Sequence, residues 1–207
     1  IRLGRIQPQR VVDVKQIPEL HSIREDEDGF RIGASVSGAE LGEHAVLRAH
    51  WPGLVEASLL IGSTQVQGRA SLGGNLCNAS PAADTVPALI AAEARCSVIG
   101  PEGRRQVPVE EIVTGAGQTS RKRGEIVTHF QLPRRPTRSG DAYLRLIPRS
   151  EMDIAVVGAG VAIRLDQDGR CMACRVALGA VAPTALLVPE AAEAVVGRIV
   201  GDEDLVN

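Results

Sequence analysis

Aromatic residues are almost absent from this chain of 207 residues. They make up 2% of it, and the whole set is Phe30, Trp51, Phe130 and Tyr143. A core must therefore be built from Val, Ile, Leu and Ala, and few side chains can stack on a flat ligand. Hydrophobic residues still reach 44%, which is an ordinary share for a globular protein. The length of the chain allows one sizeable domain or a domain with a small neighbour.

Cysteine is also scarce, and neither sign of charge dominates. The four cysteines, Cys77, Cys96, Cys171 and Cys174, form no even framework, which argues against a disulfide scaffold and favours a reducing cytoplasm. The 23 basic and 25 acidic residues give a formal net charge of -2, without a long run of either sign. This balance excludes the electrostatic pattern of a nucleic-acid or anionic-membrane binder, so a protein or small-molecule partner is expected.

Long hydrophobic runs are missing as well. The best candidate, residues 154–163, has about half of the roughly 20 apolar residues that a membrane-spanning helix needs, and it contains two glycines. We therefore expect a soluble protein with no membrane span. The sequence begins Ile-Arg-Leu-Gly-Arg, without an apolar signal core or an initiating Met, which suggests that upstream residues are absent.

Apolar patterning predicts mixed helices and strands before residue 133. Ser37 and Glu40 have the spacing of a capping box, which predicts a helix over 40–49, and Pro52 marks the start of another. A further helix is predicted over 87–94. Strands are predicted at 11–14, 30–36, 95–99, 105–109 and 125–132. Residues 62–84 are rich in Gly, Ser, Asn, Thr and Gln, which predicts a loop.

Prolines and arginines in residues 133–140 mark the best domain boundary in the chain. Beyond it, strands are predicted over 154–165 and 171–181, joined by a hairpin at Asp168-Gly169. A helix is predicted over 190–196. This second part looks too short to close a core of its own.

The predicted loop carries the most informative pattern. The glycines at positions 73 and 74 let a backbone approach a flat or anionic ligand, because no Cβ intervenes, and we expect their amides to be free to donate. Asn75, Asn78 and Ser80 add short polar side chains. A plain surface loop, with Asp84 serving a helix dipole, is the alternative. Structureless loops of this length are uncommon unless they bind something, which favours a ligand site.

The segment resembles a known cofactor signature. Residues 70–75 (Ala-Ser-Leu-Gly-Gly-Asn), followed by 78–81 (Asn-Ala-Ser-Pro) and Asp84, closely resemble the second flavin-binding signature of the molybdenum hydroxylase flavoproteins. This family includes xanthine dehydrogenase and aerobic carbon monoxide dehydrogenase. The resemblance continues, in the family's order and spacing, at residues 107–110, 124–127, 152–155 and 175–184. The ordered set is far more specific than one Gly-Gly-Asn.

The resemblance implies an α+β fold with two domains. Residues 1–136 would form a two-subdomain FAD-binding domain of the vanillyl-alcohol-oxidase (PCMH-like) type, incomplete at its N-terminus. Residues 140–207 would form a small α+β domain like the C-terminal domain of the carbon monoxide dehydrogenase flavoprotein, incomplete at its C-terminus. FAD would lie extended between the subdomains, and the sheet of the smaller domain would close over the flavin.

The resemblance also implies cofactor-binding positions, with no catalytic residue and no metal ligand in this chain. Asp84 would accept hydrogen bonds from ribityl or ribose hydroxyls, and Ile126 would lie near the adenine. Arg145 would lie near the flavin ring, where a cation could stabilise a reduced, anionic flavin. The other positions that would line FAD are Ser71, Leu72, Gly73, Gly74, Asn75, Asn78 and Ser80.

Two departures from the family pattern affect the expected binding. Gln67-Gly68 stands where the family usually has Arg-Asn, and Ser71 stands where it has Thr. The family's first glycine-rich loop, which holds the pyrophosphate, would precede residues 11–14, and the C-terminal helices are missing. The chain thus resembles the middle of a longer subunit. Without the pyrophosphate loop we expect weaker FAD binding, because its backbone amides neutralise two charges.

Several other motifs are interpreted as structural. Residues 156–163 look like a dinucleotide fingerprint but run into a charged hairpin, so their glycines are interpreted as close-packing positions in a strand. Cys171 and Cys174 have metal-ligand spacing without a second pair and are predicted to be core thiols. The four histidines are scattered surface or capping residues. The basic cluster 121–123 is predicted to be a solvated turn, although it could face an acidic partner.

The function implied by the resemblance is electron transfer in the cytoplasm. FAD would pass electrons from iron–sulfur clusters of a small partner subunit to an external acceptor, and a large partner subunit would hold the molybdenum cofactor. This protein would supply binding geometry and redox tuning. The alternatives are a non-catalytic scaffold that has lost FAD and a stand-alone flavin oxidase of the related alcohol oxidase type.

Overall fold

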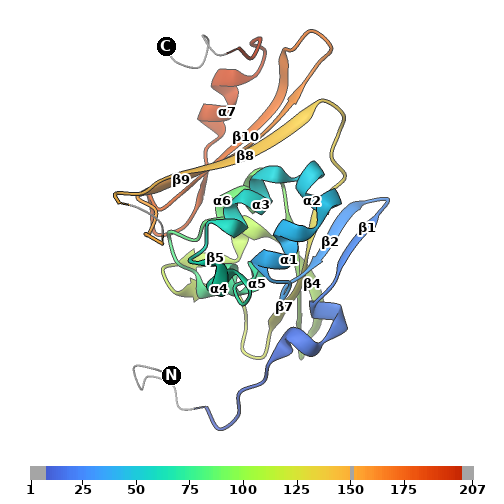
Figure 1. Ribbon diagram of the computed structural model, residues 1–207, viewed down its shortest axis with the longest axis vertical. Helices are drawn as coiled ribbons and strands as arrows, with labels where there is room; N and C mark the ends of the chain where they lie inside the picture. The colour runs from blue at the N-terminus through green and yellow to red at the C-terminus, as the bar shows by residue number, and fades with distance from the viewer. Residues whose placement is uncertain (1–7, 150–151, 202–207) are drawn as a thin grey trace.

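The computed structural model describes residues 8–149 and 152–201, which form two antiparallel sheets with helices packed between and beside them (Figure 1). The larger sheet has the strand order β1-β2-β7-β3-β4. Its strands are β1 (Ile23–Asp26), β2 (Gly29–Gly33), β7 (Ile126–Pro133), β3 (Arg95–Gly100) and β4 (Gly103–Pro108). The fold is therefore α+β, as the sequence predicted.

The smaller sheet has the order β11-β10-β9-β8. Its strands are β8 (Ser139–Leu146), β9 (Val157–Leu165), β10 (Cys171–Gly179) and β11 (Leu186–Leu187). The predicted hairpin between β9 and β10 is confirmed: Leu165 pairs with Cys171, and Gly169 has the positive φ (+82°) of a hairpin turn. A separate two-stranded ribbon joins β5 (Val113–Gly115) to β6 (Gln118–Thr119).

The helices fill the space beside these sheets. They are α1 (Gly38–Glu43), α2 (Ala45–His50), α3 (Pro52–Leu59), α4 (Thr64–Gln67), α5 (Leu72–Asn78), α6 (Thr85–Ala91) and α7 (Pro189–Val195), with short 3₁₀ helices η1 (Val14–Gln16), η2 (Pro18–Leu20) and η3 (Val109–Glu111). Helix α3 packs against β8, and α6 packs against β9 and β10 (Figure 1). In the described part of the chain, no helix is long and apolar enough to cross a membrane.

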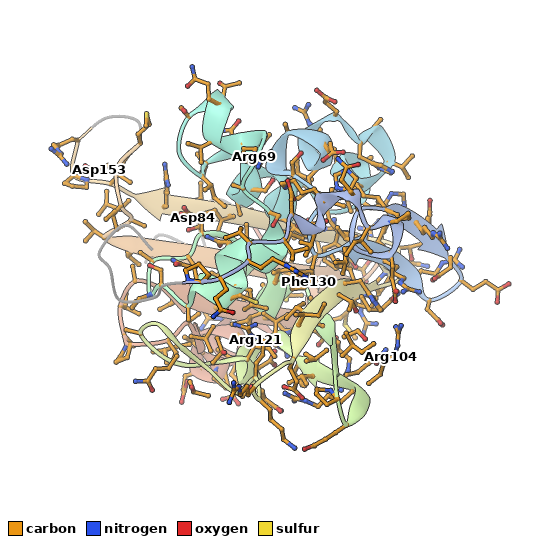
Figure 2. The ribbon with its side chains drawn as sticks, turned by 90° about the horizontal axis from the view of Figure 1, so that it is seen from below. Arg69, Asp84, Arg104, Arg121, Phe130 and Asp153 are labelled. Atoms are coloured by element: carbon orange, nitrogen blue, oxygen red, sulfur yellow. The ribbon has the colours of Figure 1, made fainter. Side chains whose placement is uncertain are left out.

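The core lies between the larger sheet and the helices. Phe130 of β7 pairs with Ile32 of β2 on one side and with Cys96 of β3 on the other, and all three side chains are fully buried. Phe130 lies deep within this layer (Figure 2). Leu and Ala side chains of the helices supply the opposite wall, as the shortage of aromatic residues required.

The predicted capping box is present, but the helix that it starts is short. Ser37 Oγ accepts a hydrogen bond from the Glu40 amide at 3.2 Å, and Glu40 Oε2 accepts one from the Ser37 amide at 3.0 Å. The predicted helix over 40–49 is divided at His44, whose Nδ1 accepts a hydrogen bond from the Leu47 amide and so begins α2. Pro52 begins α3, as predicted.

Two predicted elements are wrong. Residues 11–14 are not a strand: Val11 and Val12 are 75% and 67% exposed, and Asp13 instead starts the 3₁₀ turn η1 by accepting from the Lys15 amide. Residues 62–84 are not a structureless loop, because they contain α4 and α5. The strand and helix predictions over 30–36, 87–94, 95–99, 105–109, 125–132 and 190–196 are confirmed with shifted ends.

The glycines of residues 156–163 are close-packing positions in a strand, as interpreted from the sequence. They lie in β9, where a Cβ on Gly158 would meet the Tyr143 hydroxyl and one on Gly160 would lie 2.6 Å from backbone atoms of Pro87. Cys171 is buried and Cys174 is half-buried, and a register irregularity separates Cys171 from Ala173. Among the described residues, no three metal-ligating side chains come together.

Candidate functional site

The paired glycines of the signature lie in the first turn of α5 rather than in a loop. Ser71 is the N-cap, and its Oγ accepts from the Gly74 amide at 3.2 Å. The Gly73 amide donates to the Ala34 carbonyl oxygen at 3.0 Å. The expectation that both amides are free is therefore wrong, because the helix cap and the neighbouring chain already use them.

The two glycines have different structural reasons to lack a side chain. A Cβ on Gly73 would lie 2.6 Å from the Ala34 carbonyl oxygen, so Gly73 is required for packing. A Cβ on Gly74 would have only one close neighbour, Ser71 Oγ at 3.3 Å, and Gly74 is exposed. The open surface at Gly74 is the part of the signature that a ligand can approach.

A pocket of about 230 Å³ lies against these glycines. Ser71, Gly73 and Gly74 line one side, and Ile126 and Val127 of β7 line another. The structure thus brings together two segments that are far apart in the sequence, one from the flavin signature and one from the further family resemblance at residues 124–127. The remaining wall comes from Val14, Leu20, Ala34, Ser35, Cys77 and Arg121.

Two of the other polar residues of the signature, Asn75 and Ser80, have structural roles. Asn75 Oδ1 accepts from the Thr85 amide at 3.2 Å and from its hydroxyl at 2.6 Å, so Asn75 holds the start of α6. Ser80 Oγ accepts from the Ala82 amide at 3.3 Å. Asn78 is exposed, whereas the Leu72 side chain is buried in the core, so only the backbone of Leu72 is available to a ligand.

Asp84 and Arg145 lie away from this pocket and form a buried pair (Figure 2 places Asp84 apart from Arg121). Arg145 of β8 donates to Asp84 Oδ2 at 3.1 Å, and the Tyr143 hydroxyl donates to Oδ1 at 2.8 Å. Burial raises the pKa of Asp84, and the Tyr143 and Arg145 contacts partly offset that rise. Burial also raises the pKa of Tyr143, and the neighbouring carboxylate adds to this effect.

Arg145 also lines a second pocket, of about 550 Å³. Residues of α3, α4 and the segment between them line one wall, and Tyr143, Leu144 and Met152 contribute to the other. Each oxygen of Asp84 already accepts one hydrogen bond, but a carboxylate has about four acceptor positions. Asp84 therefore retains capacity for a hydroxyl donor.

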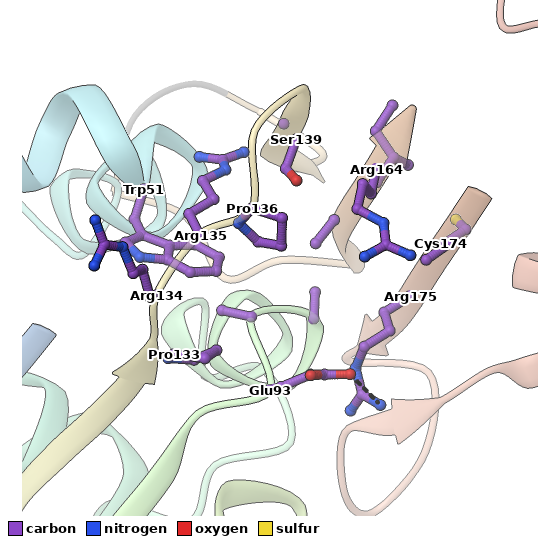
Figure 3. Close-up of a pocket in the computed structure, with 16 residues that line it drawn as sticks. Trp51, Glu93, Pro133, Arg134, Arg135, Pro136, Ser139, Arg164, Cys174 and Arg175 are labelled. Carbon is purple, nitrogen blue, oxygen red and sulfur yellow. Dashed lines mark ion pairs between the residues drawn. The ribbon is translucent and has the colours of Figure 1, made fainter. Parts of the chain in front are cut away.

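A third pocket, of about 280 Å³, lies where the segment joining β7 to β8 passes α6 and the β9–β10 hairpin (Figure 3). Arg135 stacks over Trp51 there, with its guanidinium carbon 5.0 Å from the ring centroid. Arg175 pairs with Glu93, with 3.5 Å between Nη1 and Oε1. None of the cofactor positions predicted from the sequence lines this pocket, so it is not the candidate site.

Reasoning from the sequence missed Arg121 and Cys77 as pocket residues. Arg121 belongs to the basic cluster 121–123, which was predicted to be a solvated turn. Arg123 and Lys122 are exposed, as that prediction requires, but Arg121 is half-buried. The short distance in sequence between Arg121 and the motif at 124–127 was the signal that could have placed it near the ligand.

The family is shown by comparison with known proteins. The FAD-binding domain in molybdopterin dehydrogenase matches residues 1–135, and the C-terminal domain of the CO dehydrogenase flavoprotein matches residues 142–207. The chain belongs to the flavoprotein family defined by this FAD-binding domain.

Curated relatives and solved structures agree with this assignment. A xanthine dehydrogenase FAD-binding subunit of Escherichia coli is 33% identical over 85% of this chain and 61% of its own length. The carbon monoxide dehydrogenase medium chain of Hydrogenophaga pseudoflava is 34% identical over 90% of this chain and 64% of its own length. A solved structure of carbon monoxide dehydrogenase from the same organism, lacking the Mo-pyranopterin moiety, matches 98% of this chain and 70% of that chain with a TM-score of 0.89 and 33% identity. The chain therefore spans less than two thirds of the length of these two curated relatives.

Proposed function

We propose that this chain is the FAD-carrying part of a molybdenum hydroxylase, in which electrons pass from iron–sulfur clusters of a small partner subunit through FAD to an external acceptor. A large partner subunit would hold the molybdenum cofactor. The proposed domains are residues 1–136, which bind FAD, and residues 140–207. Family membership supports this proposal, and the four free thiols support a cytoplasmic location.

The pocket beside Gly74 is the observation that carries the proposal. Its walls combine side-chain-free backbone at Gly74 with apolar contacts from Ile126 and Val127, which suits one part of an extended nucleotide. The cofactor-binding positions that we propose are Ser71, Leu72, Gly73, Gly74, Asn75, Asn78, Ser80, Asp84, Ile126 and Arg145.

These residues would bind and orient the cofactor. FAD, when bound, supplies reversible electron-transfer chemistry, so this chain needs no acid, base or nucleophile. Asp84 would accept a hydrogen bond from a cofactor hydroxyl while it keeps Tyr143 and Arg145 in place. Arg145 would keep a positive charge at the border of the larger pocket, although its ion pair with Asp84 compensates part of that charge.

Replacing Gly74 by Val tests the site. The valine side chain would occupy the open surface beside the pocket, so we expect flavin retention to be lost, roughly to background, while the domain stays folded. The measurement is released flavin per mole of the complete protein, purified gently with its partners. Gly73→Val is the matched comparison: a clash with the backbone of Ala34 should reduce folding itself. Undiminished flavin in Gly74→Val would refute the site.

The composition of the purified protein distinguishes the alternative functions. Yellow protein that carries iron and molybdenum supports the proposed complex. Colourless protein would support a scaffold that has lost FAD. Flavin without metals, together with turnover of a substrate, would support a stand-alone oxidase.

A further inference from the structure

Among the described residues that line the pocket beside Gly74, Arg121 alone is charged. It lies between β6 and β7, and Cys77 and the two glycines line the same pocket. Burial raises the pKa of Cys77, and Arg121 opposes that rise only in part, so the thiol stays protonated near neutral pH. Cys77 therefore does not neutralise Arg121.

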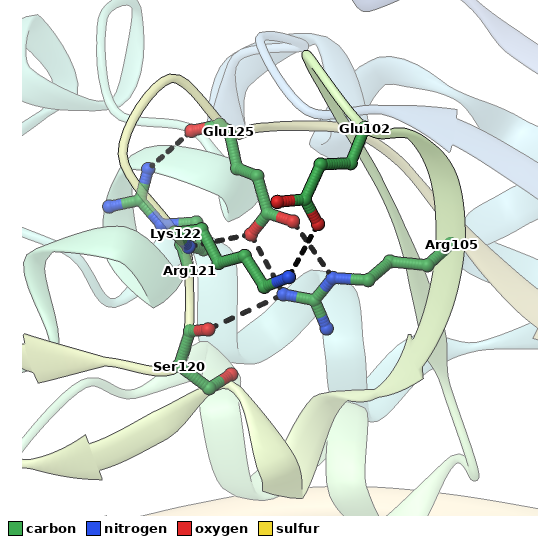
Figure 4. A network of polar contacts seen from close by, with 6 residues as sticks. All are labelled: Glu102, Arg105, Ser120, Arg121, Lys122 and Glu125. Atoms are coloured by element: carbon green, nitrogen blue, oxygen red, sulfur yellow. Dashed lines mark hydrogen bonds and ion pairs between the residues drawn. The ribbon is translucent and has the colours of Figure 1, made fainter.

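The neighbouring carboxylates are occupied by other cations (Figure 4). Glu125 accepts from Arg105 at 3.0 and 2.8 Å and from the Lys122 amide at 2.7 Å. Glu102 pairs with Lys122 at 2.5 Å. Among the described residues, Arg121 has no carboxylate within ion-pair distance. No described residue therefore compensates its positive charge.

One nitrogen of the guanidinium group also lacks an acceptor. Arg121 Nε is buried and makes no hydrogen bond to any residue that the structure describes, and Nη1 makes one long contact of 3.4 Å to the Glu125 carbonyl oxygen. Buried donors normally meet a protein acceptor, a water molecule or a ligand. A half-buried arginine with free donors at the wall of a pocket is well suited to bind an anion, and its fork matches phosphate oxygens.

We propose that Arg121 binds a phosphate of the adenosine diphosphate half of FAD. This inference rests on the proposed function and names a residue and a contact that the family signature did not supply. The two phosphates are the charged groups of FAD at neutral pH, so they are the groups that an uncompensated arginine would recognise. A pocket of about 230 Å³ is also too small for the whole cofactor, which fits a site for one portion of it. Arg145 differs because its ion pair with Asp84 already compensates part of its charge.

Binding titrations with three variants test the inference. FAD, ADP and riboflavin are titrated separately into the complete protein freed of flavin, followed by calorimetry and, for the flavins, by fluorescence. Arg121→Gln should weaken FAD and ADP binding by roughly tenfold or more, because a charge-assisted hydrogen bond is lost. Riboflavin, which has no phosphate, should bind the variant and the wild type alike.

The controls keep the result interpretable. Arg121→Lys keeps the charge and should recover part of the lost affinity. Arg123→Gln removes an exposed arginine of the same cluster and should leave all three affinities unchanged. The dependence of FAD affinity on salt should also be shallower in Arg121→Gln than in the wild type.

The outcomes separate this inference from the proposed function. If the wild type binds FAD and Arg121→Gln binds it equally well, the inference is wrong and the proposed function stands. Equal losses for FAD and riboflavin would also overturn it, because the effect would not depend on phosphate. If the wild type binds no FAD, the proposed function fails.

Discussion

The larger sheet and the smaller sheet are stabilised in different ways. The largest fully buried side chains of the described chain all lie between residues 30 and 132, in the larger sheet and its helices. In the smaller sheet, Tyr143, Cys171 and Ala177 are buried, whereas Leu144 and Leu146 of β8 are 76% and 61% exposed. The larger sheet has a core of its own, and the smaller one depends on packing against α3 and α6.

Polar contacts hold the boundary between the two sheets. Tyr143 and Arg145 of β8 reach Asp84 at the start of α6. Asp141 pairs with Arg135 at 2.8 Å and accepts from the amide of Leu54 in α3 at 3.3 Å. Buried ion pairs contribute little net stability, but they tolerate few arrangements. We therefore infer that these polar partners chiefly fix the orientation of the smaller sheet.

The largest effect on stability is expected when the centre of the core beside the larger sheet is removed. Phe130→Ala should lower the free energy of unfolding by about 3–5 kcal/mol, because it leaves a cavity under β2 and β3. Leu144→Ala, on the exposed face of β8, should change it by less than about 0.5 kcal/mol. Urea unfolding measures both variants. Similar losses in the two variants would contradict the contrast between the sheets.

A smaller effect is expected at the boundary. Tyr143→Phe removes one donor to the buried carboxylate of Asp84 and should cost about 1–3 kcal/mol of stability. Since burial already raises the pKa of Asp84, loss of this donor should raise it further. The destabilisation should therefore be larger near pH 7 than in acid, where the carboxyl is protonated. Urea unfolding across pH measures this dependence, and a loss independent of pH would argue against the role of the contact.

The smallest effect is expected at the polar network far from the boundary. The Arg105 guanidinium, with the Lys122 amide, lowers the pKa of Glu125 to about 2 from the ordinary value of 4.5. A lowered acidic pKa stabilises the fold above the ordinary value, and the gain is lost as pH falls through that value toward about 2. Glu125→Gln should be slightly less stable than the wild type at pH 7, and the difference should vanish on acidification. A stability difference that grows in acid would contradict the lowered pKa of Glu125.

Local patterns in the sequence determined much of the fold and the identity of the site. The capping box at Ser37, the turn at Gly169 and the apolar strand around Phe130 depend on near neighbours and on simple periodicity. The flavin signature also lies in contiguous residues, so it could be read without a structure.

Only the tertiary structure decided what the signature residues do. Position 73 lies in a helix, where glycine is normally unfavourable. Glycine is nevertheless required there, because Ala34 from another segment leaves no room for a Cβ. Asp84 meets Arg145, and Arg121 lines the same pocket as Gly74, through contacts between residues distant in the sequence. Composition and periodicity describe short stretches of chain, whereas these pairings depend on how separate elements pack in space.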